Sequence, residues 1–190
     1  MLQAEPKNPD AMHLIGLVAL GKGDAGQAEK FIATAAALMP RHANVWVNLG
    51  NAQRDQGKTD EALISYHRAE MINPKYPDLY LNRGQLHQDN SDYADAMDDF
   101  DQLIELKPGE ASSYMRAASA ASDAGLFREA ADYCKQALAV LGGEPAQVMA
   151  ILATTCERLG ELDEAIRWAE KALEKQPKDA GALRTWAKAR

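Results

Sequence analysis

Residues 21–26 of the sequence are GKGDAG and match the G-x-G-x-x-G pattern of dinucleotide-binding loops. Such a loop binds phosphate where it connects a strand to a helix, because the helix N-terminus then supplies the hydrogen-bond donors. Here the loop follows a segment with helical periodicity, His13–Leu20. The pattern therefore predicts a turn between two helices, and we expect no nucleotide cofactor.

The other residue types that could do chemistry are four histidines and two cysteines: His13, His42, His67, His87, Cys134 and Cys156. No His pairs with another His or Cys at a metal-ligand spacing, and the two Cys form no CxxC motif. Nor does any candidate nucleophile have a recognisable base. We expect buried structural thiols, a His87 packed between helices and an exposed His67. No metal and no catalytic residue are predicted, so the chain is expected not to be an enzyme.

An acidic run over residues 91–101, SDYADAMDDFD, raises the possibility of a cation site. It lacks the glycine and the terminal glutamate of a calcium-binding loop. A helix over this run would bury Tyr93, Ala96, Met97, Phe100 and Leu103 and turn four aspartates outward: Asp92, Asp95, Asp98 and Asp99. The run is interpreted as a solvated helix face, with docking of a basic neighbour as the alternative.

Composition and charge exclude several classes of protein. The chain has 190 residues, of which 46% are hydrophobic, and a net charge of −7. Residues 77–110 hold nine acids and two bases, whereas the rest of the chain balances at nineteen of each. This leaves no basic face for nucleic acid. No apolar run is long enough to cross a membrane, and the start, MLQAEPKNPDAMH, does not resemble a signal peptide. We expect a cytoplasmic protein.

The elements that position these residues follow a period of 34 residues. The period links Pro6, Pro40, Pro74 and Pro108; Gly16, Gly50 and Gly84; and Ala28, Ala62, Ala96 and Ala130. Fixed spacing of three residue types indicates a tandem repeat. We assign one repeat domain, residues 1–190, with repeats at about 9–42, 43–76, 77–110, 111–145 and 146–179. Residues 1–8 correspond to the end of a preceding repeat, and residues 180–190 to the start of a following helix.

The residues of repeat two resemble the tetratricopeptide repeat: Trp46, Leu49-Gly50, Gly57, Ala62, Tyr66, Ala69 and Pro74. The resemblance covers residues 9–177 and implies an all-α fold, a right-handed superhelical α-solenoid of helix–turn–helix units. The packing chemistry agrees with it. Gly50 lets two helices approach closely beside the large Tyr66, and Gly57 can adopt the left-handed conformation that ends a helix.

In such superhelices the first helix of each repeat lines a concave groove. Residues spaced i, i+4, i+7 and i+11 share one face of these helices. The candidate peptide-binding residues on this face are Asn44, Asn48, Asn51, Asp55, Asn82, Gln85, Asp89, Arg116, Ser119 and Asp123. Amides both donate and accept hydrogen bonds, so this floor suits the backbone of an extended peptide. Asn48 and Asn82 resemble the asparagine ladder of the O-linked N-acetylglucosamine transferase arrays.

An acidic column, Asp55, Asp89 and Asp123, repeats at the same period. Each residue lies near a helix C-terminus, where the helix dipole disfavours an anion by ~0.3–1 kcal/mol. One interpretation is a ligand-facing column that selects Lys or Arg in the peptide. The alternatives are pairing with a neighbour such as Arg54, or simple solvation.

The sequence therefore favours a non-catalytic protein-interaction scaffold that binds an extended peptide, across Asn48, Asn51, Asn82, Gln85 and Arg116. A first alternative is a substrate-presenting or docking region of a larger bacterial transferase, either a sulfotransferase or a glycosyltransferase. A second is a self-assembly module, because Leu183 and Trp186 are expected to lack a covering helix. Partner identity and oligomeric state are left open.

Overall fold

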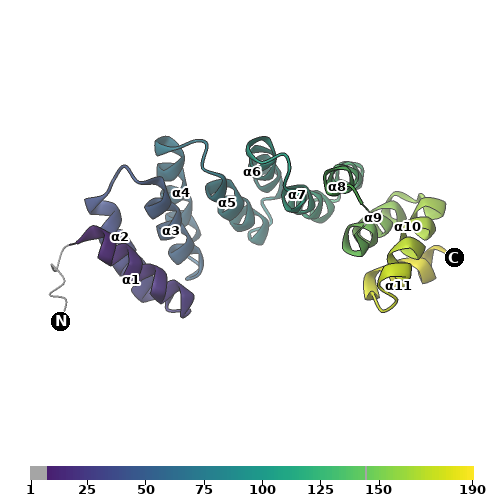
Figure 1. Ribbon diagram of the computed structural model, residues 1–190, viewed down its shortest axis with the longest axis horizontal. Helices are drawn as coiled ribbons and strands as arrows, with labels where there is room; N and C mark the ends of the chain where they lie inside the picture. The colour runs from purple at the N-terminus through teal and green to yellow at the C-terminus, as the bar shows by residue number, and fades with distance from the viewer. Residues whose placement is uncertain (1–7, 144) are drawn as a thin grey trace. The chain divides into compact units, whose positions relative to one another are not determined.

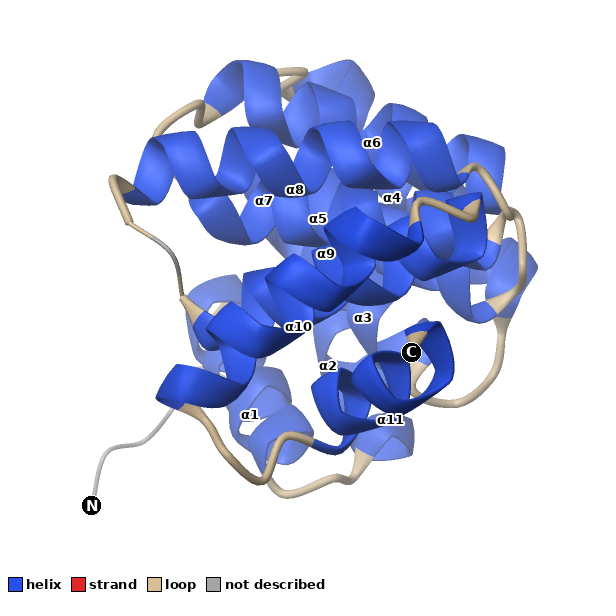
Figure 2. Cartoon of the chain, turned by 90° about the vertical axis from the view of Figure 1, so that its right-hand side faces the viewer, coloured by secondary structure: helices blue, strands red, loops and turns tan. Residues whose placement is uncertain are grey.

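The computed structural model describes residues 8–143 and 145–190, which form eleven helices and no strand (Figures 1 and 2). The helices are α1 (Pro9–Gly21), α2 (Ala25–Leu38), α3 (Ala43–Arg54), α4 (Thr59–Ile72), α5 (Pro77–Asp89), α6 (Tyr93–Leu106), α7 (Ala111–Asp123), α8 (Phe127–Leu141), α9 (Ala146–Leu159), α10 (Leu162–Lys175) and α11 (Ala180–Ala189). Most of the segment assigned to a preceding repeat, residues 1–7, lies outside the described residues.

Two compact units divide the chain between Leu86 and His87, inside α5. In the first unit, α1 packs on α2, α2 on α3, and α3 on α4. In the second unit each helix from α6 to α11 packs on the next, and α9 also contacts α11. Consecutive helices thus form helix–turn–helix pairs that stack on their neighbours, which confirms the prediction of an all-α solenoid fold.

The turns between paired helices share one backbone conformation. Gly23, Gly57, Gly125 and Gly160 all have positive φ angles, between 72° and 78°. Ser91 occupies the same repeat position with φ 67° and is the one non-glycine residue of the described chain with positive φ. Because glycine has no Cβ, it adopts this left-handed conformation at little cost. The predicted role of Gly57 is therefore confirmed, and Ser91 is identified as a strained exception.

Close approach of the paired helices depends on a second glycine column. A Cβ built on Gly50 would lie 2.6 Å from the ring of Tyr66, and one on Gly16 would lie 2.3 Å from the side chain of Ile32. Both large side chains are completely buried. The predicted packing of Gly50 against Tyr66 is therefore present.

The interior of the helix pairs consists of small and large apolar side chains in alternation. In repeat four, Ala117, Ala118, Ala120 and Ala121 are all fully buried.

Arg83 occupies a repeat position at which the other repeats have an apolar residue. Its guanidinium forms two hydrogen bonds to the Glu70 carboxylate, at 2.9 and 3.1 Å, and lies 5.6 Å from the Tyr80 ring centroid. These contacts compensate for the cost of placing a guanidinium group at a position that is apolar in the other repeats.

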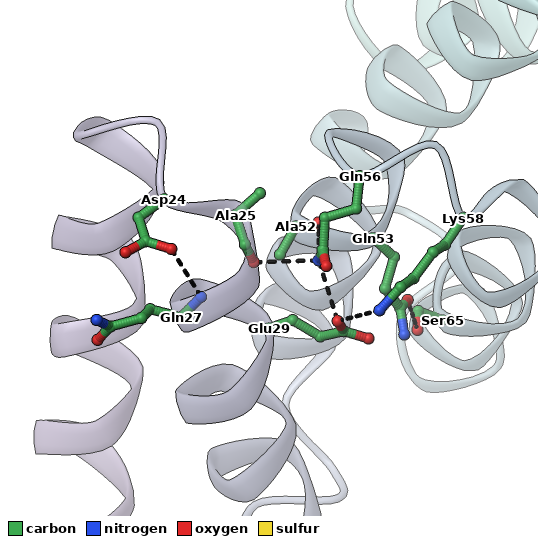
Figure 3. Close-up of polar contacts among 9 residues, drawn as sticks. All are labelled: Asp24, Ala25, Gln27, Glu29, Ala52, Gln53, Gln56, Lys58 and Ser65. Carbon is green, nitrogen blue, oxygen red and sulfur yellow. Dashed lines mark hydrogen bonds and ion pairs between the residues drawn. The ribbon is translucent and has the colours of Figure 1, made fainter.

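Polar contacts at the edge of the α2–α3 interface fix the register of these helices (Figure 3). Gln56 donates hydrogen bonds from Nε2 to Glu29 at 3.0 Å and to the carbonyl oxygens of Ala25 and Ala52. Lys58 Nζ donates to the same Glu29 carboxylate at 2.6 Å. The hydrogen bond from Lys58 is the main cause that lowers the pKa of Glu29 below its usual value.

At the C-terminal end, the expectation that Trp186 lacks cover is wrong. Its ring is half-buried against the apolar cluster that includes Met149 and Ala169, and its Nε1 donates to Glu170 at 3.1 Å. Arg190 stacks over the ring at 4.3 Å. Helix α10 supplies the cover that the sequence pattern had assigned to a missing helix. Leu183 remains 44% exposed.

Candidate functional site

The predicted groove residues of the first unit lie on α3 and α5, and several of them already contact other helices. Asn48 Nδ2 lies 2.9 Å from His13 Nε2 on α1. Asn82 accepts a long hydrogen bond from Arg54 Nη1 at 3.5 Å and donates to the carbonyl of Asp78 at 2.6 Å. The expected ladder therefore also bridges neighbouring first helices.

The other amides of this unit differ in how accessible they are. Asn51 accepts a 2.7 Å hydrogen bond from the Tyr66 hydroxyl, whose pKa is raised by burial. Gln85 is half-buried, whereas Asn44 is exposed at the start of α3. Of the five predicted amides, Asn44 is thus exposed and the other four are half-buried.

Of the acidic column, Asp55 forms an ion pair with Arg54 at 3.3 Å, which is the pairing alternative that the sequence had raised. Asp123 accepts a 2.7 Å hydrogen bond from Gln88 Nε2, and the same amide donates to Ser119 at 3.1 Å. Asp89 is exposed at the end of α5. The carboxylates of Asp55 and Asp123 therefore form bonds within the protein.

In the second unit, residues of α7, α9 and the start of α11 line an open hollow of about 370 Å³. Its walls combine hydroxyl, amide and carboxylate groups with a small apolar floor, and no Lys or Arg lines it: Ser119, Ser122, Asp123, Gln147, Ala150, Ile151, Thr154, Thr155, Asp179 and Gly181. Ser119 and Asp123 were predicted to bind a peptide. Arg116, one turn earlier on α7, is half-buried and does not line the hollow.

The hollow is held in shape by bonds between its helices. The hydroxyls of Thr154 and Thr185 lie 3.1 Å apart and join α9 to α11. Asp179 caps α11 by accepting a 2.7 Å hydrogen bond from the Ala182 amide. An ion pair between Lys188 and Glu157 adds a second link between α9 and α11. These bonds hold α11 against α9 and place Asp179 at the start of α11.

The patterns considered first for chemistry have structural roles. Residues 21–26 join α1 to α2, a helix–turn–helix connection, and Asp24 caps α2 through the Gln27 amide at 3.0 Å. A dinucleotide loop would need a preceding strand, and the described residues contain none. Among the described residues, no group of three His, Cys, Asp or Glu side chains is placed to hold a metal ion.

Both cysteines are free and buried, as expected. Burial raises the pKa of the Cys134 thiol to about 12 and also raises that of Cys156. A thiol in this state is a weak nucleophile. Burial lowers the pKa of His13, whose ring contacts Asn48, because the charged form of histidine is the protonated one.

Among the remaining candidates, His67 is 68% exposed, as predicted. His87 packs between helices, 3.9 Å from Asp99 and 3.9 Å from Asp92. The outward orientation expected for Asp99 is wrong, since this residue is only 4% exposed. The helical period placed it at the edge of the buried stripe, and its proximity to His87 accounts for the difference. Asp92, Asp95 and Asp98 are exposed.

No described helix combines the length and apolar character that a membrane crossing requires.

The sequence analysis did not predict that Gln147, Thr154 and Asp179 would line a single hollow. Gln147 and Thr154 lie on the predicted inner face of the first helix of repeat five. The sequence did not predict that Asp179, the N-cap residue of α11, would line the same hollow.

The fold and the arrangement of its first helices define a tandem helical-repeat protein. Comparison with protein families identifies which one. A profile described as "TPR repeat" matches residues 50–91, and one described as "Tetratricopeptide repeat" matches residues 81–143 and 115–180. The second profile alone spans more than half of the chain, so the chain belongs to the tetratricopeptide repeat family. No curated protein matches the chain by sequence.

Solved structures show the same fold. A tetratricopeptide repeat protein from Parabacteroides merdae superposes with a TM-score of 0.82 at 22% identity, covering 95% of this chain and 72% of that protein. The MamA protein gives 0.79 at 20% identity, covering 90% of this chain and 93% of its own. PilF of Pseudomonas aeruginosa gives 0.75 at 18% identity, with coverages of 98% and 85%. At these identities the similarity establishes the fold alone.

Proposed function

We propose that the chain is a non-catalytic protein-interaction scaffold that binds an extended, basic peptide segment on the inner face of its first helices. The observation that carries the proposal is the hollow formed by α7, α9 and α11. A concave site with a few fixed polar groups around an apolar floor is the usual form of a binding pocket. Repeat proteins commonly use the equivalent surface of their arrays for binding.

The chemistry of the walls favours a peptide with a cationic side chain. Asp123 and Asp179 place two carboxylates at the hollow, and no lining residue carries a positive charge. The hydroxyl of Thr154 and the amide of Gln147 can bond a peptide backbone, while Ala150 and Ile151 offer apolar contact. An anionic peptide would meet repulsion at the same walls.

In the first unit, the exposed Asn44 is the best-placed amide to bind such a segment. Asn48, Asn51, Asn82 and Gln85 are proposed to contribute the parts of their side chains that remain accessible. Because Asn48 and Asn82 also connect neighbouring helices, their removal would affect folding as well as binding. The buried thiols, which are weak nucleophiles, support the absence of catalysis and fit a reducing cytoplasm.

The test is a titration with two twelve-residue peptides of identical sequence except that one carries Lys where the other carries Glu. We expect calorimetry to show binding of the Lys peptide alone, weakening as salt rises because the attraction between charges is screened. Asp123→Asn combined with Gln147→Ala should weaken it about tenfold or more, since each lost contact contributes on the order of 1 kcal/mol.

The matched control removes two exposed carboxylates from α6, with Asp95→Ala and Asp98→Ala. This variant should bind the Lys peptide as the wild type does. Loss of binding in the α6 variant but not in the α7–α9 variant would refute the proposal and assign recognition to the acidic outer helix. Equal binding of the Glu peptide would refute the preference for basic segments.

A further inference from the structure

One recurring position of the array lies near the end of each first helix. It holds Arg54 on α3, Gln88 on α5, Ser122 on α7 and Glu157 on α9, at steps of 34, 34 and 35 residues. The last step equals the spacing of the left-handed turn glycines of repeats four and five. Arg54 reaches the next first helix and donates to Asn82 at 3.5 Å. Three of the four side chains are long, and Ser122 is the exception.

The other two long side chains also bond the next first helix. Gln88 on α5 donates to Ser119 on α7 at 3.1 Å. Glu157 on α9 pairs with Lys188 on α11. Ser119 and Lys188 share a second repeat position, with Thr154 on α9 between them, at steps of 35 and 34 residues. Both bonds therefore join the same two positions of consecutive repeats.

The junction between α7 and α9 lacks this connection. Its two positions hold Ser122 and Thr154, whose short side chains both line the hollow of about 370 Å³. The Thr154 hydroxyl donates to the Ala150 carbonyl and contacts Thr185 on α11. Within the described residues, no hydrogen bond or ion pair joins Ser122 to α9. The hollow therefore lies where the neighbouring junctions have a long side chain.

The walls of the hollow determine which group can take that place. Asp123 and Asp179 line it, and none of the described lining residues is Lys or Arg. Gln88 holds the Asp123 carboxylate by donating to it at 2.7 Å. An ammonium group donates three hydrogen bonds and accepts none, so it matches walls of carboxylate and hydroxyl groups.

The next junction already contains such a group, because the Lys188 ammonium meets Glu157 there. The size of the hollow agrees with a single side chain. Its volume of about 370 Å³ is near the lower end of the range for ligand pockets, roughly 300–1,000 Å³.

We propose that the hollow receives one lysine side chain of the bound peptide, which inserts between α7 and α9 and supplies the missing connection. This inference rests on the proposed function and adds that Ser122 determines specificity, because its short side chain leaves the space that the lysine occupies. The carboxylates of Asp123 and Asp179 accept hydrogen bonds from the ammonium group. The apolar stem of the lysine contacts Ala150 and Ile151.

Peptides with shortened side chains test insertion separately from charge. The probe is the twelve-residue Lys peptide that tests the proposed function, compared with versions that carry ornithine or 2,4-diaminobutyrate in place of the lysine. The side chains become shorter by one and two methylene groups, and the charge stays the same. An inserted side chain must reach its acceptors, so calorimetry should show at least about tenfold weaker binding of the diaminobutyrate peptide, with ornithine intermediate.

A substitution in the protein tests the role of Ser122. Ser122→Gln introduces the residue type that α5 has at this position, and its longer side chain should occupy the hollow. Binding of the Lys peptide should weaken at least about tenfold, although the net charge of the protein is unchanged. The matched control is Ser112→Gln, the same substitution at an exposed position of α7 outside the hollow, which should bind as the wild type does.

Circular dichroism and urea unfolding of both variants separate lost binding from lost folding. Ser122→Gln should be at least as stable as the wild type, because the new amide can bond Thr154 as Gln88 bonds Ser119. The peptide series uses the unchanged protein, so it tests insertion even where a variant misfolds.

Two outcomes would overturn insertion and leave the proposed function intact. The first is equal affinity for the lysine, ornithine and diaminobutyrate peptides, since the cation would then bind at the open surface. The second is undiminished binding of the Lys peptide to a folded Ser122→Gln variant. Failure of the Lys peptide to bind the wild type is a different result, because it refutes the proposed function and insertion together.

Discussion

The ring of Tyr66 occupies the space that a side chain at Gly50 would need. A Cβ on residue 50 would lie 2.6 Å from the ring, and the ring cannot move away because it is fully buried and its hydroxyl is bonded to Asn51. Alanine is favoured over glycine in a helix by about 1 kcal/mol. Here the steric conflict outweighs that preference, since overpacking typically costs about 1–3 kcal/mol.

We therefore expect Gly50→Ala to lower the free energy of unfolding by about 1–2 kcal/mol in urea titrations. Gly21→Ala is the control. Nothing lies within 4 Å of a Cβ at this helical position, so the substitution should be neutral or stabilising by up to about 1 kcal/mol. Equal gains at both positions would show that the Tyr66 ring relaxes without cost.

Replacement of Ser91 with glycine is expected to stabilise the protein. Its φ of 67° lies in the left-handed region, where the Cβ of an L-residue is disfavoured, and glycine occupies this position in the equivalent turns at 23, 57, 125 and 160. Ser91→Gly should raise the free energy of unfolding by about 0.5–1 kcal/mol. Gly57→Ser, the reverse change at φ 72°, should lower it by a similar amount. A destabilised Ser91→Gly variant would contradict the argument.

An aromatic residue near the start of helices α3, α5 and α7 also contributes to stability. Tyr80 donates from its hydroxyl to the carbonyl of Pro74 at 2.7 Å, and Tyr114 and Trp46 make the same contact to the carbonyls of Pro108 and Pro40, both at 3.1 Å. Each bond ties a helix to the turn six residues before it. Tyr80→Phe removes the bond and keeps the ring.

Thermal or urea unfolding should show that Tyr80→Phe destabilises the chain by about 1 kcal/mol. The comparison variant is Tyr93→Phe, whose hydroxyl makes only a 3.4 Å contact with Ser91. Its effect should stay within about 0.5 kcal/mol. If both variants lose the same stability, the contact with the proline carbonyl has no special importance.

Glu70 should make stability depend on pH in the acidic range. The hydrogen bond from Arg83 is the main cause that lowers the pKa of Glu70 below its ordinary value of 4.5. The fold therefore favours the ionised carboxylate. Its contribution is fully present above pH 4.5 and is lost as pH falls through the lowered folded-state pKa.

At pH 7, Glu70→Gln should be less stable than the wild type by about 0.5–1 kcal/mol, and this difference should shrink as pH falls below 4.5. Urea titrations of both proteins at several pH values measure it. A difference that stays constant from pH 7 to pH 3 would mean that hydrogen bonding of the neutral side chain, not charge, is responsible.

The periodic positions of the chain made its fold predictable. Gly50 and Ala62 recur at a period of 34 residues, and this spacing alone identified a repeated helix pair. Ser91 shows how far this extends, since the repeat position determined its φ although the residue type opposed it. The backbone conformation is set by the repeat, and the residue type adapts to it.

The polar surface was less predictable because it depends on pairs of side chains. Spacing placed Asn48 on the inner stripe but could not show that His13 lies 2.9 Å away. The burial of Asp99 beside His87 and the cover of Trp186 by α10 likewise depend on rotamers and on contacts between helices. A periodic pattern specifies which face a residue occupies, but not which partner it meets there.

The connections between neighbouring helices also have a kinetic consequence. Bonds such as His13 to Asn48, Gln56 to Glu29, and Gln88 to Asp123 join residues separated by 35, 27 and 35 positions in the chain. Chains whose contacts span short stretches of sequence close small loops and fold quickly. In a stacked array, such local contacts also let structure nucleate in one repeat and spread to the next. These polar bridges between neighbouring repeats thereby favour fast folding to the native state.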